Sequence, residues 1–235
     1  MAAPSTPPLR VERVLDAAAD LLVRWGYQRV TIEEVARRAG IGKGTVYLHF
    51  RTKEELFLLV LLRIHHRVVS ALVERLLAEP AEVLPGRMLR SLFTDLAADA
   101  VTRPLYLGDP EVLGRLAHQA AETLGELGAQ RDAVVAQHFA LLREAGLLRR
   151  DLSPEELRYV QTAVMTGFLF VDGFPLPYAP TGTDERAALL EHALAAALHA
   201  PDPPAGPTPE LAARVAELYR SLIVHIDEEW RARVR

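Results

Sequence analysis

Four side chains that can contact nucleic acid recur within one short segment of this chain. They are Lys43, Thr45, Tyr47 and His49, a cation, a hydroxyl, a phenol and an imidazole. If the segment is helical, all four project outward, and Gly42, Lys43 and Gly44 form an exposed amino end. A cation and hydrogen-bonding groups on the open face of a helix suit the major groove of DNA.

Two short helices are predicted to hold these side chains in place. Residues 31–50 read TIEEVARRAGIGKGTVYLHF, which we interpret as a helix-turn-helix. Ala36 is small where the second helix would cross the first, Gly40 can adopt the positive φ that ends a helix abruptly, and Val46 returns an aliphatic side chain to the crossing. The predicted buried side is completed by Val35 and Ile41.

Other chemistries fit the same residues less well. The run 40–45 (GIGKGT) lacks the four residues between glycines and the preceding strand that a phosphate-binding loop requires. An ordinary helical corner that binds no nucleic acid remains an alternative at this point.

The adjacent pair His65 and His66 cannot face one metal ion from one side of a helix. No catalytic motif and no metal or cofactor site is expected.

Composition and charge favour an intracellular protein with a basic amino-terminal part. The 235 residues carry a net charge of -4 and no cysteine, which excludes disulfides and thiolate metal sites. Residues 1–66 hold ten Lys/Arg against seven Asp/Glu, a charge of +3, which leaves -7 for the remainder. The longest apolar run, 56–62, is too short to cross a bilayer. Because no secretion signal is visible, we expect a cytoplasmic protein without a membrane span.

Helix start signals recur along the chain and predict an all-α fold. Capping boxes are read at Thr31, Thr52 and Ser153, and a cap residue precedes proline at Asp109 and Thr208. One apolar stripe, ended by Gly26, marks the first helix; it comprises Val11, Val14, Leu15, Ala18, Leu22 and Trp25. The predicted helices span 9–25, 32–39, 43–49, 53–78, 87–101, 110–123, 126–145, 154–172, 184–199 and 209–232.

The match extends beyond the helical corner to a known family. The stretch WGYQRVTIEEVARRAGIGKGTVYLHFRTKEELF, with the helix before it, resembles the DNA-binding domain of TetR-family transcriptional regulators over about residues 10–60. The resemblance implies that Thr31, Tyr47, His49 and Lys53 hold phosphates. It also implies that Lys43, Gly44 and Thr45 lie near base edges or backbone. Such a domain would bind double-stranded DNA at an inverted-repeat operator.

In that family the remaining chain forms a divergent helical domain that dimerises and binds a small molecule. The domains expected here are a disordered tail at 1–8, a three-helix helix-turn-helix domain at 9–52, and a larger ligand-binding and dimerisation domain at 53–200, which begins with a connecting helix at 53–78. A proline-rich joint and an extra helix follow at 201–235. Candidate side chains for a largely apolar effector are Phe93, His118, His138, Phe139, Met165 and Phe168.

Assembly and function follow from these expectations. Helix 154–172 is apolar nearly all round and should be buried on several sides, within the monomer or at a dimer interface. We expect it to pair with helix 184–199, through Leu189, Leu190, Ala193, Leu194, Ala197 and Leu198, in a four-helix bundle between two copies. The predicted function is a homodimeric, ligand-responsive DNA-binding regulator, most simply a repressor. The alternatives are an activator and a helical dimeric binding or scaffold protein without DNA recognition.

Overall fold

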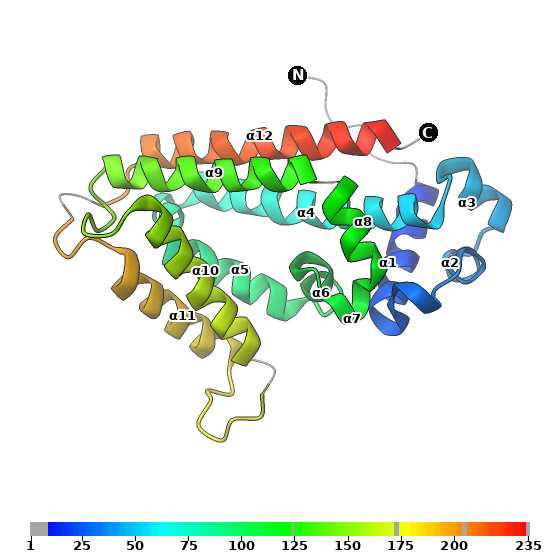
Figure 1. Ribbon diagram of the computed structural model, residues 1–235, viewed down its shortest axis with the longest axis horizontal. Helices are drawn as coiled ribbons and strands as arrows, with labels where there is room; N and C mark the ends of the chain where they lie inside the picture. The colour runs from blue at the N-terminus through cyan, green and yellow to red at the C-terminus, as the bar shows by residue number, and fades with distance from the viewer. Residues whose placement is uncertain (1–8, 124, 172–173, 204–205, 234–235) are drawn as a thin grey trace. The chain divides into compact units, whose positions relative to one another are not determined.

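Helices dominate the computed structural model, which describes residues 9–123, 125–171, 174–203 and 206–233 (Figure 1). They are α1 (Leu9–Arg29), α2 (Ile32–Ala39), α3 (Lys43–His49), α4 (Lys53–Ala78), the 3₁₀ helix η1 (Pro80–Val83), α5 (Pro85–Ala98), α6 (Thr102–Leu107), α7 (Pro110–Leu113), α8 (Arg115–Thr123), α9 (Gly125–Glu144), α10 (Pro154–Val171), α11 (Thr183–Leu198) and α12 (Pro209–Arg233). Within the described ranges the sole β-type pairing is an isolated bridge between Leu148 and His199. The predicted all-α fold is confirmed.

The helices divide into two compact units. The first combines Met1–Val68, Asp99–Ala129 and Ile223–Arg235, and the second combines Val69–Ala98 with Gln130–Leu222. The domains expected from the sequence instead follow the chain in order, at 9–52, 53–200 and 201–235. Helix α4 contributes residues to both units without a break.

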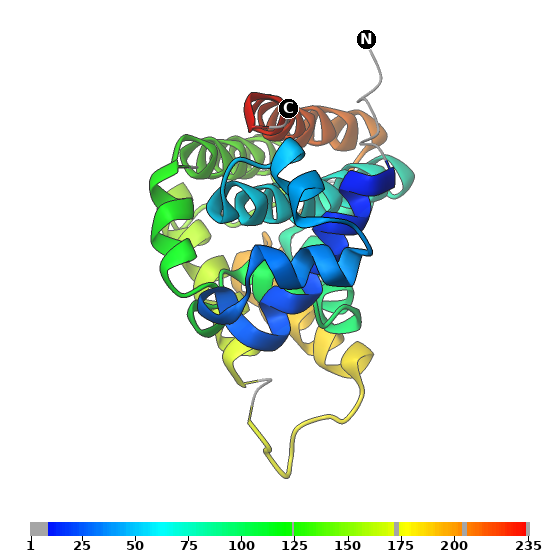
Figure 2. The same ribbon diagram turned by 90° about the vertical axis from the view of Figure 1, so that its right-hand side faces the viewer.

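In the first unit, α1 packs against α2, α7 and α8. Figure 2 shows α1, α2 and α3 in blue, next to one another. The core here includes Leu15, Leu22 and Phe57, all fully buried. The ring of Tyr27 meets that of Phe57 edge-on, with 5.5 Å between centroids. Helix α2 thus packs on α1, and α3 packs on α2.

In the second unit, α5 and α11 pack closely along their length, and α10 packs on α11. The close approach depends on Gly86, because a Cβ atom there would lie 2.9 Å from the backbone oxygen of Glu191. The side chain of Glu191 also accepts a hydrogen bond from Arg90 at 2.7 Å. The side of α11 that faces inward is lined by Ala187, Leu190, Leu194 and Leu198.

All five helix starts read from the sequence are confirmed by the observed caps. The boxes at Thr31 and Ser153 are complete, with the side chain of each cap residue bonded to the backbone N–H three positions on. Thr52 and Thr208 accept from the N–H groups of the first turn. The carboxylate of Asp109 accepts from the N–H groups of the two residues that follow Pro110.

Several expected helix boundaries are wrong, and glycine and proline explain why. The helix expected over 110–123 is two helices, α7 and α8, because Gly114 takes a φ of 50° between them. Helix α6 lies between two predicted helices, in a stretch for which no helix is predicted. Pro104 lies in its first turn, where the missing N–H costs no hydrogen bond. Likewise Pro85 begins α5 two residues before the predicted start, and the helix ends at Ala98 rather than at residue 101.

One prediction about burial is wrong, because Trp25, placed on the buried stripe of the first helix, is 41% exposed. For helix α10, expected to be buried within the monomer or at a dimer interface, burial within the monomer is excluded. Leu157 is its one buried residue, and Phe170 is 69% exposed. Its apolar surface is therefore not covered within one copy of the chain.

Helix α4 is long and apolar enough to span a membrane by length and composition alone, although no such span is expected from the sequence. Its most apolar stretch of 18 residues has a mean hydropathy of 1.8. Of that stretch, 56% is buried inside the protein, as in the core helix of a globular fold. Length and composition alone are therefore weak evidence that α4 spans a membrane.

Candidate DNA-binding surface and ligand pocket

The turn between α2 and α3 is built by a glycine in the left-handed conformation. Gly40 has a φ of 69° and ends α2, and the N–H of Ile41 then donates to the carbonyl of Ala36 at 3.0 Å. Ala36 and Val46 are buried where the two helices cross, as predicted. Ile41, predicted to be buried, is partly exposed. The chain thus forms a helix-turn-helix whose inner side is apolar.

The start of α2 is fixed by Thr31, one of the predicted phosphate-binding residues. Its hydroxyl donates to the Glu34 carboxylate at 2.8 Å and accepts from the Glu34 N–H at 3.3 Å. The Thr31 N–H also donates to that carboxylate, at 2.9 Å. Thr31 is exposed, and its hydroxyl is engaged in this capping box.

Helix α3 turns its predicted DNA-contacting side chains away from the core. Lys43, Gly44 and Tyr47 are exposed, whereas Thr45 and His49 are half-buried. The ammonium of Lys43 lies 5.7 Å from the centroid of the Tyr47 ring. Val46 is the one buried residue of α3, and the polar side chains of the helix lie on its other sides.

The first cation of α3, Lys43, is paired with a carboxylate of α2. The Lys43 ammonium donates to the Glu33 carboxylate of α2, and this hydrogen bond raises the pKa of Lys43 and lowers that of Glu33. Both groups lie at the surface, where an ion pair contributes little to stability. The ion pair with Glu33 therefore does little to fix the position of Lys43.

Lys53, predicted to hold a phosphate, lies at the start of α4 and contacts Tyr27 of α1. Its ammonium donates to the Tyr27 carbonyl at 2.5 Å and lies 4.3 Å from the centroid of the Tyr27 ring. Partial burial lowers the pKa of Lys53. The Tyr27 hydroxyl in turn donates to Glu54 at 2.7 Å. These contacts join the end of α1 to the start of α4, next to the helix-turn-helix.

One exposed residue of α3 was missed by the sequence analysis. Leu48 is 70% exposed, although it is a large apolar side chain. The sequence carried a signal for it, because Leu48 follows Gly44 by one helical turn and so shares its outward face. Nearby on α2, Arg38 forms an ion pair with Asp20 of α1 at 2.7 Å.

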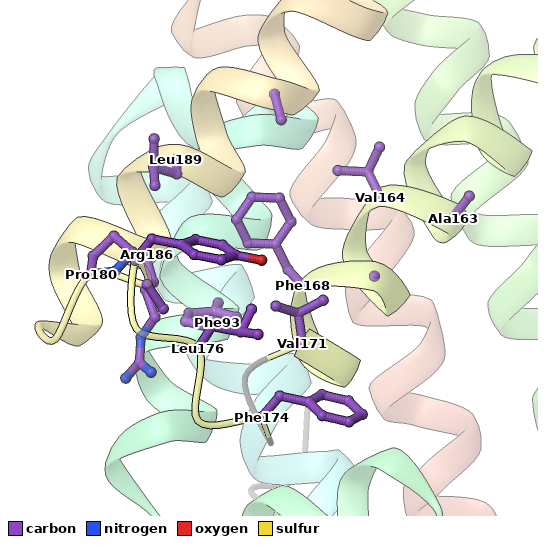
Figure 3. A pocket seen from close by; sticks show the side chains of 14 residues that line it. Phe93, Ala163, Val164, Phe168, Val171, Phe174, Leu176, Pro180, Arg186 and Leu189 are labelled. Carbon is purple, nitrogen blue, oxygen red and sulfur yellow. The ribbon is translucent and has the colours of Figure 1, made fainter.

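An apolar pocket of about 600 Å³ lies in the second unit, between α5, α10, α11 and the loop at 174–180. Two of the predicted ligand residues, Phe93 and Phe168, line it, and both are labelled among the lining side chains in Figure 3. Arg186 is the one charged residue of the lining, and its guanidinium points away from the apolar side chains (Figure 3). The volume and the lining suit a largely apolar small molecule.

The other predicted ligand residues do not line this pocket. His138 and Phe139 are buried in α9, and Met165 is half-buried on α10. His118 is exposed on α8, in the first unit. Among the described residues, no group of three His, Cys, Asp or Glu side chains is placed to hold a metal ion.

His138 instead joins three elements of the second unit. Its Nε2 lies 2.8 Å from the Val83 carbonyl and its Nδ1 lies 3.2 Å from the Tyr219 hydroxyl. Because a carbonyl can only accept, Nε2 carries the proton and Nδ1 accepts from the tyrosine. Burial lowers the pKa of His138 to about 4, so the side chain is neutral at pH 7.

The geometry defines a class of protein: an all-helical DNA-binding protein of the helix-turn-helix type, with an apolar pocket in a separate unit. Comparison with known proteins agrees. Residues 14–60 match the family model of bacterial regulatory proteins, tetR family. The HTH-type transcriptional regulator YhgD of Bacillus subtilis is 44% identical over 48 residues, which are 20% of this chain and 25% of that protein.

Longer matches cover the second unit as well. The HTH-type transcriptional regulator TtgR of Pseudomonas putida is 29% identical over 167 residues, 68% of this chain and 76% of that protein. The structure of NalD, the secondary repressor of a multidrug efflux pump in Pseudomonas aeruginosa, covers 82% of this chain and 97% of its own, with 22% identity and a TM-score of 0.60. Residues 14–60 therefore carry the DNA-binding domain typical of TetR-family transcriptional regulators, and the longer matches are to regulators of the same helix-turn-helix type.

Proposed function

We propose that this regulator is a homodimeric repressor that binds an inverted-repeat operator and is released from it by a small, largely apolar molecule. The observation that carries the proposal is the outward face of α3, where Lys43, Thr45, Tyr47 and His49 are all unburied. Phosphate contacts from such groups position a domain on DNA, while side chains in the groove read the bases. The site of action is then the cytoplasm.

Dimerisation is supported by the uncovered apolar surface of α10 and α11. Tyr159, Phe170 and Val171 of α10 and Leu189 of α11 are exposed in a single copy of the chain. Contiguous exposed apolar side chains mark interaction surfaces. A recognition helix as short as α3 reads only a few base pairs, so two copies related by a two-fold axis are needed to select a site.

Release by a ligand is supported by the pocket and by the continuity of α4. The pocket is apolar enough to bind a small molecule without charge pairing. A ligand shifts the balance between operator-bound and free conformations only by its difference in affinity for the two. A difference of about 2 to 3 kcal/mol lowers operator affinity roughly 30- to 150-fold. Helix α4, which begins beside the helix-turn-helix and continues into the second unit, is the proposed connection.

A mobility-shift experiment with the DNA upstream of the protein's own gene tests the proposal. We expect binding by the natural chain, and at least ten-fold weaker binding by Lys43→Ala, because this substitution removes an exposed cation of α3. Arg220→Ala, which removes an exposed cation of α12, is the matched control and should bind normally.

The second candidate function, a dimeric scaffold without DNA recognition, predicts a different outcome. The natural chain would then show no shift at low salt beyond that of unrelated DNA, and Lys43→Ala would change nothing. Analytical ultracentrifugation at micromolar concentration tests the dimer separately. A monomer there would contradict the proposed assembly without affecting the DNA-binding assignment.

A further inference from the structure

Two unusual residues occupy the centre of the outward face of α3. At 100° per residue, Gly44 and Leu48 each lie about 160° around the helix axis from the buried Val46. They therefore point more directly away from the core than any other residue of the helix. Lys43 and Tyr47 flank them on one side, and Thr45 and His49 flank them on the other.

Neither residue is explained by contacts within the chain. A Cβ atom at Gly44 would have no atom within 4 Å, so close packing does not require glycine there. Gly44 lies in the first turn of α3, and glycine has a lower helix propensity than alanine. Leu48, at 70% exposure, leaves most of its side chain in water. Gly44, which has no side chain, and the exposed Leu48 thus lie one helical turn apart at the centre of the outward face.

The chemistry of Leu48 restricts what that partner offers. A leucine side chain neither donates nor accepts a hydrogen bond, so it cannot hold a phosphate or a polar base edge. In the major groove of DNA the apolar feature of a base is the C5 methyl group of thymine. The missing side chain of Gly44 lets the helix approach the groove closely enough for this contact.

We propose that Leu48 is a specificity-determining residue that reads the methyl group of one thymine in each half of the operator. This inference rests on the proposed function, since it requires α3 to enter the major groove. Burial of one methyl group against Leu48 contributes about four-fold to affinity, and the two halves of a dimer-bound site together contribute roughly 15-fold.

The experiment uses the full chain and a pool of randomised DNA duplexes. The natural protein, Leu48→Ala and the control Leu77→Ala, which shortens another exposed leucine, on α4, are each used to select binding sequences. We expect the natural protein and Leu77→Ala to select the same inverted repeat. Leu48→Ala should select the same repeat with the preference for one thymine in each half relaxed. Its melting temperature should match that of the natural protein, because Leu48 is exposed.

Replacing that thymine by deoxyuridine in the selected duplex removes the methyl group alone. The natural protein should then bind about four-fold more weakly per substituted half-site, while Leu48→Ala should bind both duplexes equally. If deoxyuridine weakens both proteins to the same extent, or neither, Leu48 does not read the methyl group and the inference is overturned. If no sequence is enriched by the natural protein, the proposed DNA-binding function itself falls, and this inference with it.

Discussion

The buried histidine of the second unit makes acid destabilisation a quantitative test of the structure. Burial lowers the pKa of His138 to about 4 in the folded protein, whereas the ordinary value is 6.5. The unfolded chain therefore takes up this proton at a higher pH than the folded chain. Stability contributed by neutral His138 is fully present above pH 6.5 and is lost as the pH falls toward 4.

The size of the loss follows from these two values. Each unit of pKa difference corresponds to about 1.4 kcal/mol, which gives a total of roughly 3 kcal/mol at full protonation. Between pH 7 and pH 5 the expected loss in the free energy of unfolding is about 2 kcal/mol. In the neutral form Nε2 donates to the Val83 carbonyl and the bare Nδ1 accepts from the Tyr219 hydroxyl.

Urea unfolding at pH 7 and at pH 5 measures this loss, and His138→Gln is the matched control. Glutamine can still donate to the Val83 carbonyl but does not titrate, so the variant should lose about 2 kcal/mol less than the natural protein between the two pH values. Subtracting the two profiles removes the contributions of the other histidines. Equal losses in the two proteins would refute the assignment of His138 as a buried neutral residue.

Three further predictions concern packing, charge and assembly. Gly86→Ala places a Cβ atom 2.9 Å from the backbone oxygen of Glu191 and should lower the free energy of unfolding by about 1 to 3 kcal/mol, measured by thermal melting; an unchanged melting temperature would contradict the close approach. Glu33→Gln frees Lys43 from its ion pair and should tighten DNA binding a few-fold in fluorescence anisotropy, whereas weaker binding would show that the pair positions Lys43. Phe170→Arg should convert the dimer to a monomer in sedimentation, and an intact dimer would exclude this face.

The parts of the fold that were predictable depend on short-range chemistry. The cap at Thr31, the left-handed turn at Gly40 and the buried contact at Val46 each follow from neighbouring residues, and each is observed. The helix around Pro104 and the break at Gly114 were not predicted, because proline and glycine are each compatible with either a helix end or a turn. Which of these forms depends on caps and on packing against distant residues, which a sequence pattern does not contain.

The DNA-binding surface and the pocket were likewise predictable only where they depend on local spacing in the sequence. Helical spacing identified the outward face of α3, but Leu48 was overlooked because an apolar residue in a helix normally reads as core. His138 was read as a ligand residue because its partners, Val83 and Tyr219, lie 55 and 81 positions away in the chain. The pocket itself depends on the path of the loop at 174–180, which carries no periodic signal.

The salt dependence of DNA binding tests most directly whether α3 is the reading element of a dimer. Affinity for the upstream duplex is measured by fluorescence anisotropy between about 50 and 200 mM salt. Six to eight phosphate contacts from two copies predict that log affinity falls against log salt with a slope of roughly -5 to -7. Salt-independent binding, or no binding at the lowest salt, would contradict the account.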